Sequence, residues 1–589
     1  MMNAVNKIRN KFMSEIKLNS QAFSLPDDLR RAVEQELSDW NRENKTERLW
    51  AKDAGLWTNE DEAKWLGWLS IVEKQRDEIA RIENFQNEVR QRGFSHILLL
   101  GMGGSSLAPE VLSFTFGKQD GFPEFHILDS TAPAQVRAVE EKIDLANTLF
   151  IVASKSGSTL EPNCFKQYFF ERVAETVGRE NAGKQFVAIT DPNSKMQRVA
   201  ERDGFWRIFF GLPEIGGRFS VLSDFGMIPA AAMGLNAGEF LNRAALMVEA
   251  CQNADAEKNP GVMLGAILGA AHRSGRDKLT IFTSPQIFDL GAWLEQLIAE
   301  STGKNGVAII PIDGEEILPI GNYGDDRIFV HLKLEGSRNP HEDAAIEALV
   351  RAGQPVVEIN LPDAGNLGQE FFRWEIATAV AGSVMQINPF NQPDVEAAKI
   401  EARKITEEYE KTGELPEETA FFEENGIKLF TDARNLAELD ALLAGEKSLT
   451  NYLRAHFARI KADDYFALLA YLEMNAESFQ ILSNLRHWVL ENYRAATCLG
   501  FGPRFLHSTG QAYKGGANNG IFLQITSDDT VDFPVPEQNF TFGVVKAAQA
   551  RGDFQVLLDR SRRALRVHLG KDLETDFEIL MAALKSNNS

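Results

Sequence analysis

Short apolar runs alternate with helix-like stretches along most of this chain. A first cycle of strand-length runs comprises HILLLG (96–101), FHILD (125–129), TLFIVASK (148–155) and QFVAIT (185–190). A second cycle comprises KLTIFTS (278–284), VAIIPI (307–312), RIFVHLKL (327–334) and PVVEINL (355–361). Continuously apolar strands that alternate with helices are typical of parallel sheets buried on both faces. The pattern therefore predicts an α/β protein with two parallel-sheet units.

The two ends of the chain have a different texture. Up to about residue 90, apolar residues recur every three or four positions and stop at Gly93, which predicts helices. From about residue 405 a charged, proline-interrupted stretch leads into a mixed, glycine-rich region. We expect a helical N-terminal region at 1–90, a first α/β unit at 91–254, a second at 255–404 and an appended C-terminal α/β domain at 405–589.

Composition excludes several classes of protein. The 589 residues carry a net charge of -22, and an acidic chain of this kind repels nucleic acid and anionic membrane surfaces. The three cysteines are far apart and form no Cys-x-x-Cys pair, which argues against a disulfide scaffold and a structural zinc site. No run of about eighteen apolar residues and no signal-peptide core occurs. We expect a cytoplasmic protein.

A glycine-rich turn, GMGGSSLAPEVL at residues 101–112, lies where a predicted strand ends and a helix begins. Glycines such as Gly104 let the backbone approach a ligand closely, and Ser105 places a hydroxyl at a helix N-terminus, which favours an anion. The spacing is not that of a dinucleotide fingerprint. The turn predicts an anion site, although a plain strand-to-helix turn has the same small residues.

A hydroxyl-rich turn, SKSGSTLEPN at residues 154–163, also follows an apolar strand and precedes a helix. It holds Ser154, Ser156, Ser158 and Thr159, and Lys155 adds a positive charge. A phosphate monoester has three acceptor oxygens, which suit hydroxyls and helix amides. One hydroxyl would be enough to cap a helix, so four favour a phosphate site.

These two turns resemble those of the sugar isomerase (SIS) domain. With GGRFSVLSDFGMIPA (216–230), EQLIAESTGKNG (295–306) and NPFNQPDVEAAK (388–399), they form a set that resembles the phosphoglucose isomerase family. Segments 48–69 and 505–526 are similar to the isomerase half of fused transaldolase–phosphoglucose isomerase proteins. The resemblance implies two SIS-type, three-layer, parallel-sheet units. It also implies reversible isomerisation of glucose 6-phosphate and fructose 6-phosphate through an enediol, a step of glycolysis and gluconeogenesis.

The resemblance assigns roles to individual residues. Glu300 matches the base that moves a proton between C2 and C1, and Gln296, four residues earlier on the same helix face, matches a glutamine that contacts the sugar. Lys399 matches a lysine that helps ring opening or stabilises developing negative charge. Arg218 matches the arginine that stabilises the enediolate. Ser105, Ser154, Ser156 and Thr159 carry over as phosphate ligands. From the residues alone, a solvated Glu, Lys or Arg is the ordinary alternative at each charged position.

One departure concerns ring opening. The family usually borrows a histidine from a neighbouring subunit, roughly twenty residues beyond the base, but here that region reads PIDGEEILPIGNYGDDR and has none. His507, in LHSTGQ, is a candidate substitute, and a loop histidine bonded to the backbone is the alternative. Lys399 alone or solvent could also serve ring opening.

The resemblance implies neither cofactor nor metal, a small-molecule sugar phosphate as the partner, and a homodimer. Two rivals remain open. A non-catalytic sugar-phosphate-binding regulator would need the phosphate turns but neither Glu300 nor Lys399. A broader isomerase that also accepts mannose 6-phosphate would share every motif. A transaldolase barrel is disfavoured, because the strands that it would need are assigned elsewhere.

Overall fold

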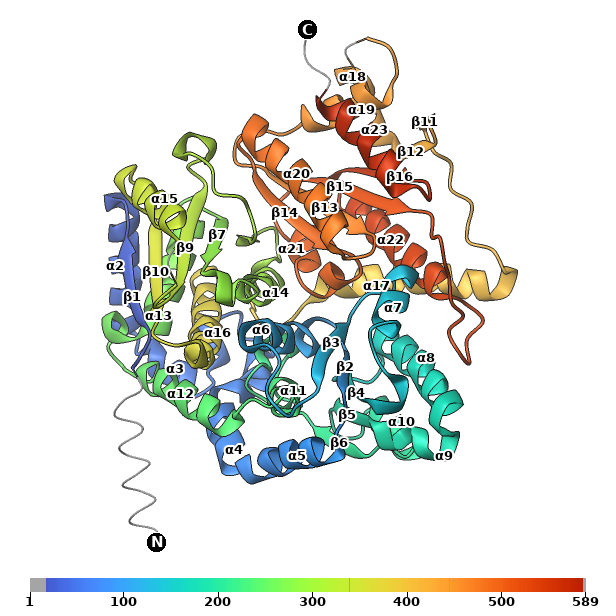
Figure 1. Ribbon diagram of the computed structural model, residues 1–589. Coiled ribbons are helices and arrows are strands. Elements are labelled where there is room, and N and C mark those ends of the chain that lie inside the picture. Colours follow the sequence, from blue (N-terminus) through green and yellow to red (C-terminus); the bar gives the residue numbers. More distant parts are fainter. Residues whose placement is uncertain (1–16, 338, 444, 586–589) are drawn as a thin grey trace, which may run out of the picture.

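The chain folds around three sheets, one in each of three consecutive parts (Figure 1). This computed structural model describes residues 17–337, 339–443 and 445–585. The α/β architecture with parallel sheets predicted from the apolar runs is confirmed. Among the helices of the described residues, none combines the length and the apolar character that crossing a membrane requires.

The first unit is a five-stranded sheet of order β3-β2-β4-β5-β6 with parallel pairing throughout. Its strands are β2 (His96–Leu100), β3 (Glu124–Leu128), β4 (Thr148–Ala153), β5 (Phe186–Thr190) and β6 (Arg207–Phe210). Alternate residues of β2, such as Leu99 and Leu100, belong to two different apolar clusters, so both faces of the sheet are buried. Its helices are α6 (Leu107–Phe116), α7 (Pro133–Glu140), α8 (Leu160–Val177), α9 (Arg179–Ala182) and α10 (Lys195–Arg202).

Strand order in this sheet explains where a ligand would bind. From β2 the chain adds β3 on one side and then returns to add β4 on the other. Ligands of open α/β sheets bind beyond the carboxyl ends of the strands at such a switch point. The glycine-rich turn follows β2 and the hydroxyl-rich turn follows β4, so both lie at that place.

The second unit repeats this plan with the order β1-β10-β9-β7-β8. Its parallel strands are β7 (Lys278–Thr283), β8 (Ile310–Ile312), β9 (Arg327–Leu334) and β10 (Val356–Leu361). Its helices are α14 (Leu290–Thr302), α15 (Pro340–Arg351) and α16 (Leu367–Val384). Helix α14 leaves from the carboxyl end of β7, the strand at the switch point, and carries the EQLIAES motif.

The N-terminal region is mostly helical, as its periodicity predicts, but it also supplies a strand. Residues Ser20–Ser24 form β1, which pairs antiparallel with β10. The backbone of Asn19 is held by Gln369 and Arg373 of α16, and these contacts lie about 350 positions away in sequence, which no local pattern encodes. The helices of this region are α2 (Asp27–Arg42), α3 (Lys45–Trp50), α4 (Ile71–Asp77) and α5 (Ile79–Arg92). Residues 1–16 lie outside the described residues.

Three helices join the two units into one body: α11 (Asp224–Ala232), α12 (Ala237–Ala250) and α13 (Pro260–Arg273). One continuous apolar cluster contains Leu99 of the first sheet, Ile281 of the second and Trp68 of the N-terminal region. Glycines of α13 allow this close packing, because a Cβ at Gly265 would lie 2.5 Å from the Ala377 carbonyl oxygen of α16. The two units therefore share one closely packed core.

The C-terminal domain has a six-stranded sheet of order β11-β12-β16-β15-β13-β14. Strands β13 (Tyr465–Tyr471), β14 (Ala496–Phe501), β15 (Gly520–Ser527) and β16 (Arg563–Leu569) are parallel, and β11 (Phe422–Glu424) and β12 (Ile427–Phe430) add an antiparallel edge. Its helices are α17 (Pro393–Thr412), α18 (Ala433–Leu442), α19 (Leu449–Phe457), α20 (Ala476–Tyr493), α21 (Gly510–Gly515), α22 (Phe542–Asp559) and α23 (Leu573–Lys585).

This domain packs on both preceding units. One shared cluster joins Ile310 of β8 to Tyr465 and Tyr513, and another joins Phe165 of α8 to Phe542 of α22. The C-terminal domain is thus part of the same folded body, and the segment after β14 is directed at the first two units.

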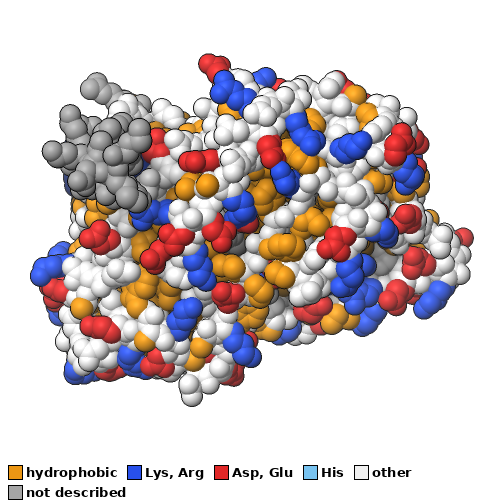
Figure 2. Space-filling model, turned by 90° about the horizontal axis from the view of Figure 1, so that it is seen from below, with side chains coloured by type: hydrophobic (Ala, Val, Ile, Leu, Met, Phe, Trp, Pro, Cys, Tyr) orange, Lys and Arg blue, Asp and Glu red, His pale blue; other side chains and the backbone are white. Residues whose placement is uncertain are grey.

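The surface mixes both charge signs. On the face shown in Figure 2, acidic and basic side chains are interspersed and hydrophobic side chains appear between them. The net charge of -22 is therefore not gathered into a single acidic field on that face.

Candidate active site

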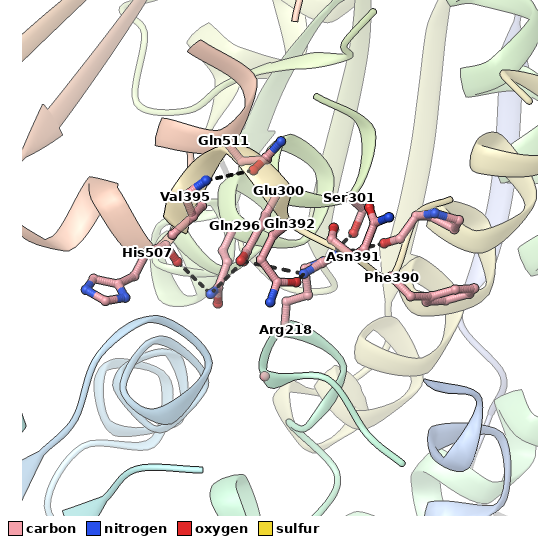
Figure 3. Close-up of polar contacts among 12 residues, drawn as sticks. Arg218, Gln296, Glu300, Ser301, Phe390, Asn391, Gln392, Val395, His507 and Gln511 are labelled. Atoms are coloured by element: carbon pink, nitrogen blue, oxygen red, sulfur yellow. Dashed lines mark hydrogen bonds and ion pairs between the residues drawn. The ribbon is translucent and has the colours of Figure 1, made fainter. Parts of the chain in front are cut away.

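Helix α14 presents the two predicted side chains together. Gln296 and Glu300 lie one turn apart, and both are buried, with Glu300 only 8% exposed. The Nε2 of Gln296 donates to Glu300 Oε2 (3.2 Å) and to the backbone carbonyl of His507 (2.7 Å), as Figure 3 shows. The carboxylate is held in place by a neighbour that also binds the C-terminal domain.

Arg218 meets Glu300 from the first unit. The guanidinium is 2% exposed, and its Nη1 lies 3.5 Å from Glu300 Oε1. Burial lowers the pKa of Arg218, and the negative charge of Glu300 partly restores it. Further hydrogen bonds go to the Ser301 hydroxyl, Gln392 Oε1 and the backbone carbonyls of Pro389 and Asn391. A fixed cation thus faces a fixed carboxylate inside the protein.

The glycine-rich turn is wedged against these residues. A Cβ at Gly103, whose φ is +52°, would lie 2.6 Å from Gln296 Nε2 and 2.7 Å from the His507 carbonyl oxygen. A Cβ at Gly104 would lie 2.1 Å from the carbonyl oxygen of Gly217. The glycines therefore make room for the protein's own chain beside Arg218, a reason that the sequence alone does not reveal. Ser105 is half-buried at the base of this turn.

The hydroxyl-rich turn contains one side chain with unused hydrogen-bonding capacity. Ser154 is 3% exposed, and its Oγ has no hydrogen-bond partner among the described residues. Ser156 and Ser158 are exposed and bond each other, with their Oγ atoms 2.9 Å apart, and Thr159 precedes α8 without capping it through its side chain. Buried hydroxyls are normally satisfied, so the Ser154 hydroxyl is available to a ligand.

Lys155 binds two groups that lie outside this turn in sequence. Its Nζ binds Asp191 Oδ2 (2.6 Å) and the Leu212 carbonyl (2.9 Å), an arrangement that ties β4 to β5. The serines of the turn therefore lie near the N-terminus of α8, whereas the Lys155 ammonium group is already bound by Asp191 and the Leu212 carbonyl.

His507 is delivered to the site by the C-terminal domain. Its Nε2 lies 2.9 Å from Glu161 Oε1 in the first turn of α8, and Gln549 donates to the same oxygen at 2.6 Å. Burial acts to raise the pKa of Glu161, but the charge and hydrogen bond of His507, with help from Lys399, bring it below its ordinary value. The Nδ1 of His507 makes no hydrogen bond within the described residues.

Lys399 sits at the edge of this group. It lies on α17, its side chain is 42% exposed, and its ion-pair contact is to Glu396 at 3.9 Å. The start of α17 is docked on α21, because Gln511 Oε1 accepts hydrogen bonds from the backbone N–H groups of Asp394 and Val395. Lys399 is therefore the solvent-exposed cation of the set, and its charge helps to lower the pKa of Glu161.

A buried network fixes the segment that carries His507. Three residues earlier, Arg504 forms a bidentate pair with Glu110 (2.6 and 2.8 Å) and binds Asp129 (2.8 Å). Ser106 of the glycine-rich turn donates to the same Asp129 at 3.1 Å. Burial, and secondarily the charge of Glu110, raises the pKa of the nearby Asp289 to about 8. The domain interface thus positions His507 through ionic contacts.

Glu161 is the site residue that sequence reasoning missed. It stands inside the SKSGSTLEPN motif, where a first-turn carboxylate reads as an ordinary helix-dipole partner. In the structure Glu161 is only 4% exposed, which is unusual for a carboxylate and draws attention to its contacts. Nothing in the sequence indicates this burial, so sequence reasoning does not single the residue out.

Comparison with known proteins identifies relatives of this arrangement. The sequence model of the family described as phosphoglucose isomerase matches residues 69–315. A glucose-6-phosphate isomerase of Parasynechococcus marenigrum is 30% identical over 413 residues, which cover 60% of this chain and 74% of the relative. That of Rubrobacter xylanophilus is 31% identical over 357 residues, covering 53% of this chain and 82% of the relative.

A solved structure shares the fold. The crystal structure of a hypothetical protein from Thermus thermophilus superposes with a TM-score of 0.57 at 24% identity. The match covers 65% of this chain and 99% of that chain.

Proposed function

The chain belongs to the phosphoglucose isomerase family, and on that premise we propose that Glu300 is the base with which it interconverts glucose 6-phosphate and fructose 6-phosphate. The observation that carries the proposal is the buried contact of Arg218 with Glu300, braced by Gln296. Aldose–ketose isomerisation needs one carboxylate that shuttles a proton and one cation that stabilises an enediolate, and this pair supplies both.

In the proposed reaction, Glu300 removes the proton from C2 of the open-chain aldose. The electron pair forms the C1–C2 double bond, and the carbonyl oxygen O1 takes up the negative charge, which Arg218 stabilises. The same carboxyl then returns its proton to C1 while O2 becomes the carbonyl oxygen and its hydroxyl proton passes to O1. No atom is gained or lost, so the product is the ketose.

The phosphate is proposed to bind between the two turns at the switch point of the first sheet. Helices α6 and α8 point their amino ends there, and their free N–H groups favour a dianion. Ser154 supports the proposal most directly, because its buried hydroxyl lacks a partner within the described residues. Ser105, Ser156, Ser158 and Thr159 would complete the hydroxyl set, and Gly104 and Lys155 would shape the two turns.

Ring opening is assigned to His507, with Lys399 as an auxiliary cation. In Figure 3 the His507 ring lies on the side of Gln296 away from Arg218, so the two groups can address opposite ends of one sugar. The hydrogen bond to Glu161 fixes the orientation of the ring, as carboxylates do for catalytic histidines. His507 would give a proton to the ring oxygen as the bond between that oxygen and C1 breaks, and a water molecule would take the O1 proton, which leaves the open-chain aldehyde.

We also propose a homodimer in the cytoplasm, as the family resemblance implies. Because His507 belongs to the same chain as Glu300, activity per chain should not change when the dimer is diluted into monomers. The similarity of segments 48–69 and 505–526 to fused transaldolase proteins, and the acceptance of mannose 6-phosphate, stay predictions. A non-catalytic regulator is disfavoured, because the similar relatives are named as isomerases.

The decisive experiment is a coupled assay of fructose 6-phosphate conversion with Glu300→Gln. The variant keeps the hydrogen bond to Gln296 but loses the base, so kcat should fall by about 10³-fold or more with little change in KM. Glu249→Gln, an exposed position on α12, is the matched control and should keep full activity. Exchange of the C2 proton in deuterated water should vanish with the activity. Retained turnover in Glu300→Gln would remove this residue from the mechanism.

A further inference from the structure

A cluster of two imidazoles and one carboxylate lies outside the candidate active site. His96 opens β2 and pairs directly with Glu124, which opens β3, while Leu98 pairs with His126. Residues two apart on a strand share a face, so His96, Glu124 and His126 project from the same face of the β2–β3 pair. Within the described residues, this is the one group of three or more such side chains whose ligand atoms converge.

The distances suit a metal ion. The Nδ1 of His96 lies 3.1 Å from Nε2 of His126, and one ligand atom from each of the three residues falls within 4.8 Å of the others. Two imidazole nitrogens bound tetrahedrally to zinc at about 2.0–2.1 Å are about 3.3 Å apart, close to the separation seen here. Without a metal ion, this contact is a hydrogen bond in which one neutral ring donates an N–H and the other accepts it. With a metal ion, both nitrogens would be unprotonated and would face the ion.

The position of the cluster is accessible from solvent and separate from catalysis. The histidines are half-buried and Glu124 is exposed, so a bound ion would keep an open position for water. His126 and Lys142 line a cavity of ≈ 270 Å³ between β3 and the C-terminal domain, which contributes Met474 and Phe501 to its lining. The glycine-rich turn begins at the opposite end of β2, about 16 Å along the strand from His96.

We propose that His96, Glu124 and His126 bind one divalent transition-metal ion of the zinc class. Imidazole and carboxylate ligands suit zinc, cobalt, nickel and copper better than magnesium or calcium. An ion held by both strands would clamp the edge strand β3 to β2, and its effect would be on stability. This site is independent of the proposed function, because none of its ligands takes part in the isomerisation.

The test uses zinc and cobalt ions with the full-length, metal-free protein. Calorimetry should give one zinc ion per chain, cobalt should give the visible absorption of a low-symmetry site with nitrogen ligands, and saturation with zinc should raise Tm by about 2 °C. His96→Ala and His126→Ala should each weaken binding by more than about tenfold, and Glu124→Gln should weaken it by less. His487→Ala is the matched control, because His487 also faces two carboxylates, Glu316 and Glu491.

Should an alanine variant fail to fold, His96→Gln and His126→Gln keep polar side chains at the same positions and serve the same comparison. Isomerase activity should be the same with and without zinc. The proposal is overturned if the wild-type protein binds neither ion at millimolar concentration, or if both histidine variants bind zinc as tightly as the wild type.

Discussion

Replacing His507 separates ring opening from proton transfer. We choose His507→Gln because the side-chain amide nitrogen of glutamine can take the place of Nε2 and keep a hydrogen bond to Glu161. The side chains of His507 and Glu161 are 12% and 5% exposed, so removing the donor altogether would leave a buried carboxylate with Gln549 as its remaining side-chain hydrogen-bond donor. Such a loss costs about 3–5 kcal/mol of stability. The glutamine variant avoids that cost and removes the acid–base group alone.

The size of the effect follows from the role assigned to the ring. A positioned general acid or base contributes about 10²–10⁴-fold, so kcat with cyclic glucose 6-phosphate should fall by at least about 10²-fold. An analogue without the 4- and 5-hydroxyls, 4,5-dideoxyglucose 6-phosphate, cannot close a five- or six-membered ring. Its isomerisation should be unchanged within about threefold, because Glu300 and Arg218 are untouched.

The assay is a steady-state comparison of the two substrates for wild type and variant, with Tm measured on both proteins. An equal loss on both substrates would mean that His507 only supports the structure. Full activity with the cyclic sugar would assign ring opening to Lys399 or solvent.

Three further outcomes test the surrounding structure. Arg504→Lys cannot form a bidentate pair, so it should lower kcat for the cyclic substrate by about tenfold and spare the open-chain analogue; equal losses would refute a role in positioning the imidazole. Gly104→Ala places a Cβ 2.1 Å from the Gly217 carbonyl oxygen and should lower kcat by about 10²-fold, whereas Gly216→Ala, which meets no atom within 4 Å, should be active. The pKa of Asp289 is raised by burial from 3.8 to about 8, so its contribution to stability is full below pH 3.8 and is lost as the pH rises through 8. In thermal unfolding, Asp289→Asn should therefore lose less Tm than wild type between pH 5 and pH 8, and parallel curves would contradict this.

Local sequence predicted much of the architecture. RIFVHLKL was expected as a strand at 327–334 and forms β9 over Arg327–Leu334, and HILLL forms β2. Strands buried on both faces must be continuously apolar, so their composition alone marks them. Strand β1 was not anticipated, because SQAFS has no such composition and owes its place to β10 and α16.

The candidate site was predictable where its chemistry stands in one motif. Gln296 and Glu300 share a helix face by spacing, and the structure places Arg218 against them. Lys155 was expected to add positive charge near the phosphate, and this stays a prediction; in the structure its Nζ lies 2.6 Å from Oδ2 of the half-buried Asp191.

Local sequence specifies the set of elements and the order of the turns that follow them, because helix and strand patterns depend on neighbours a few residues away. Which side chains of the candidate site come into contact depends on the tertiary structure. Glu161 and His507 are 346 positions apart, and their contact exists because Arg504 holds the segment after β14 against the first unit through Glu110 and Asp129. Burial and charge pairing across such distances depend on the packed core, and no local pattern specifies them.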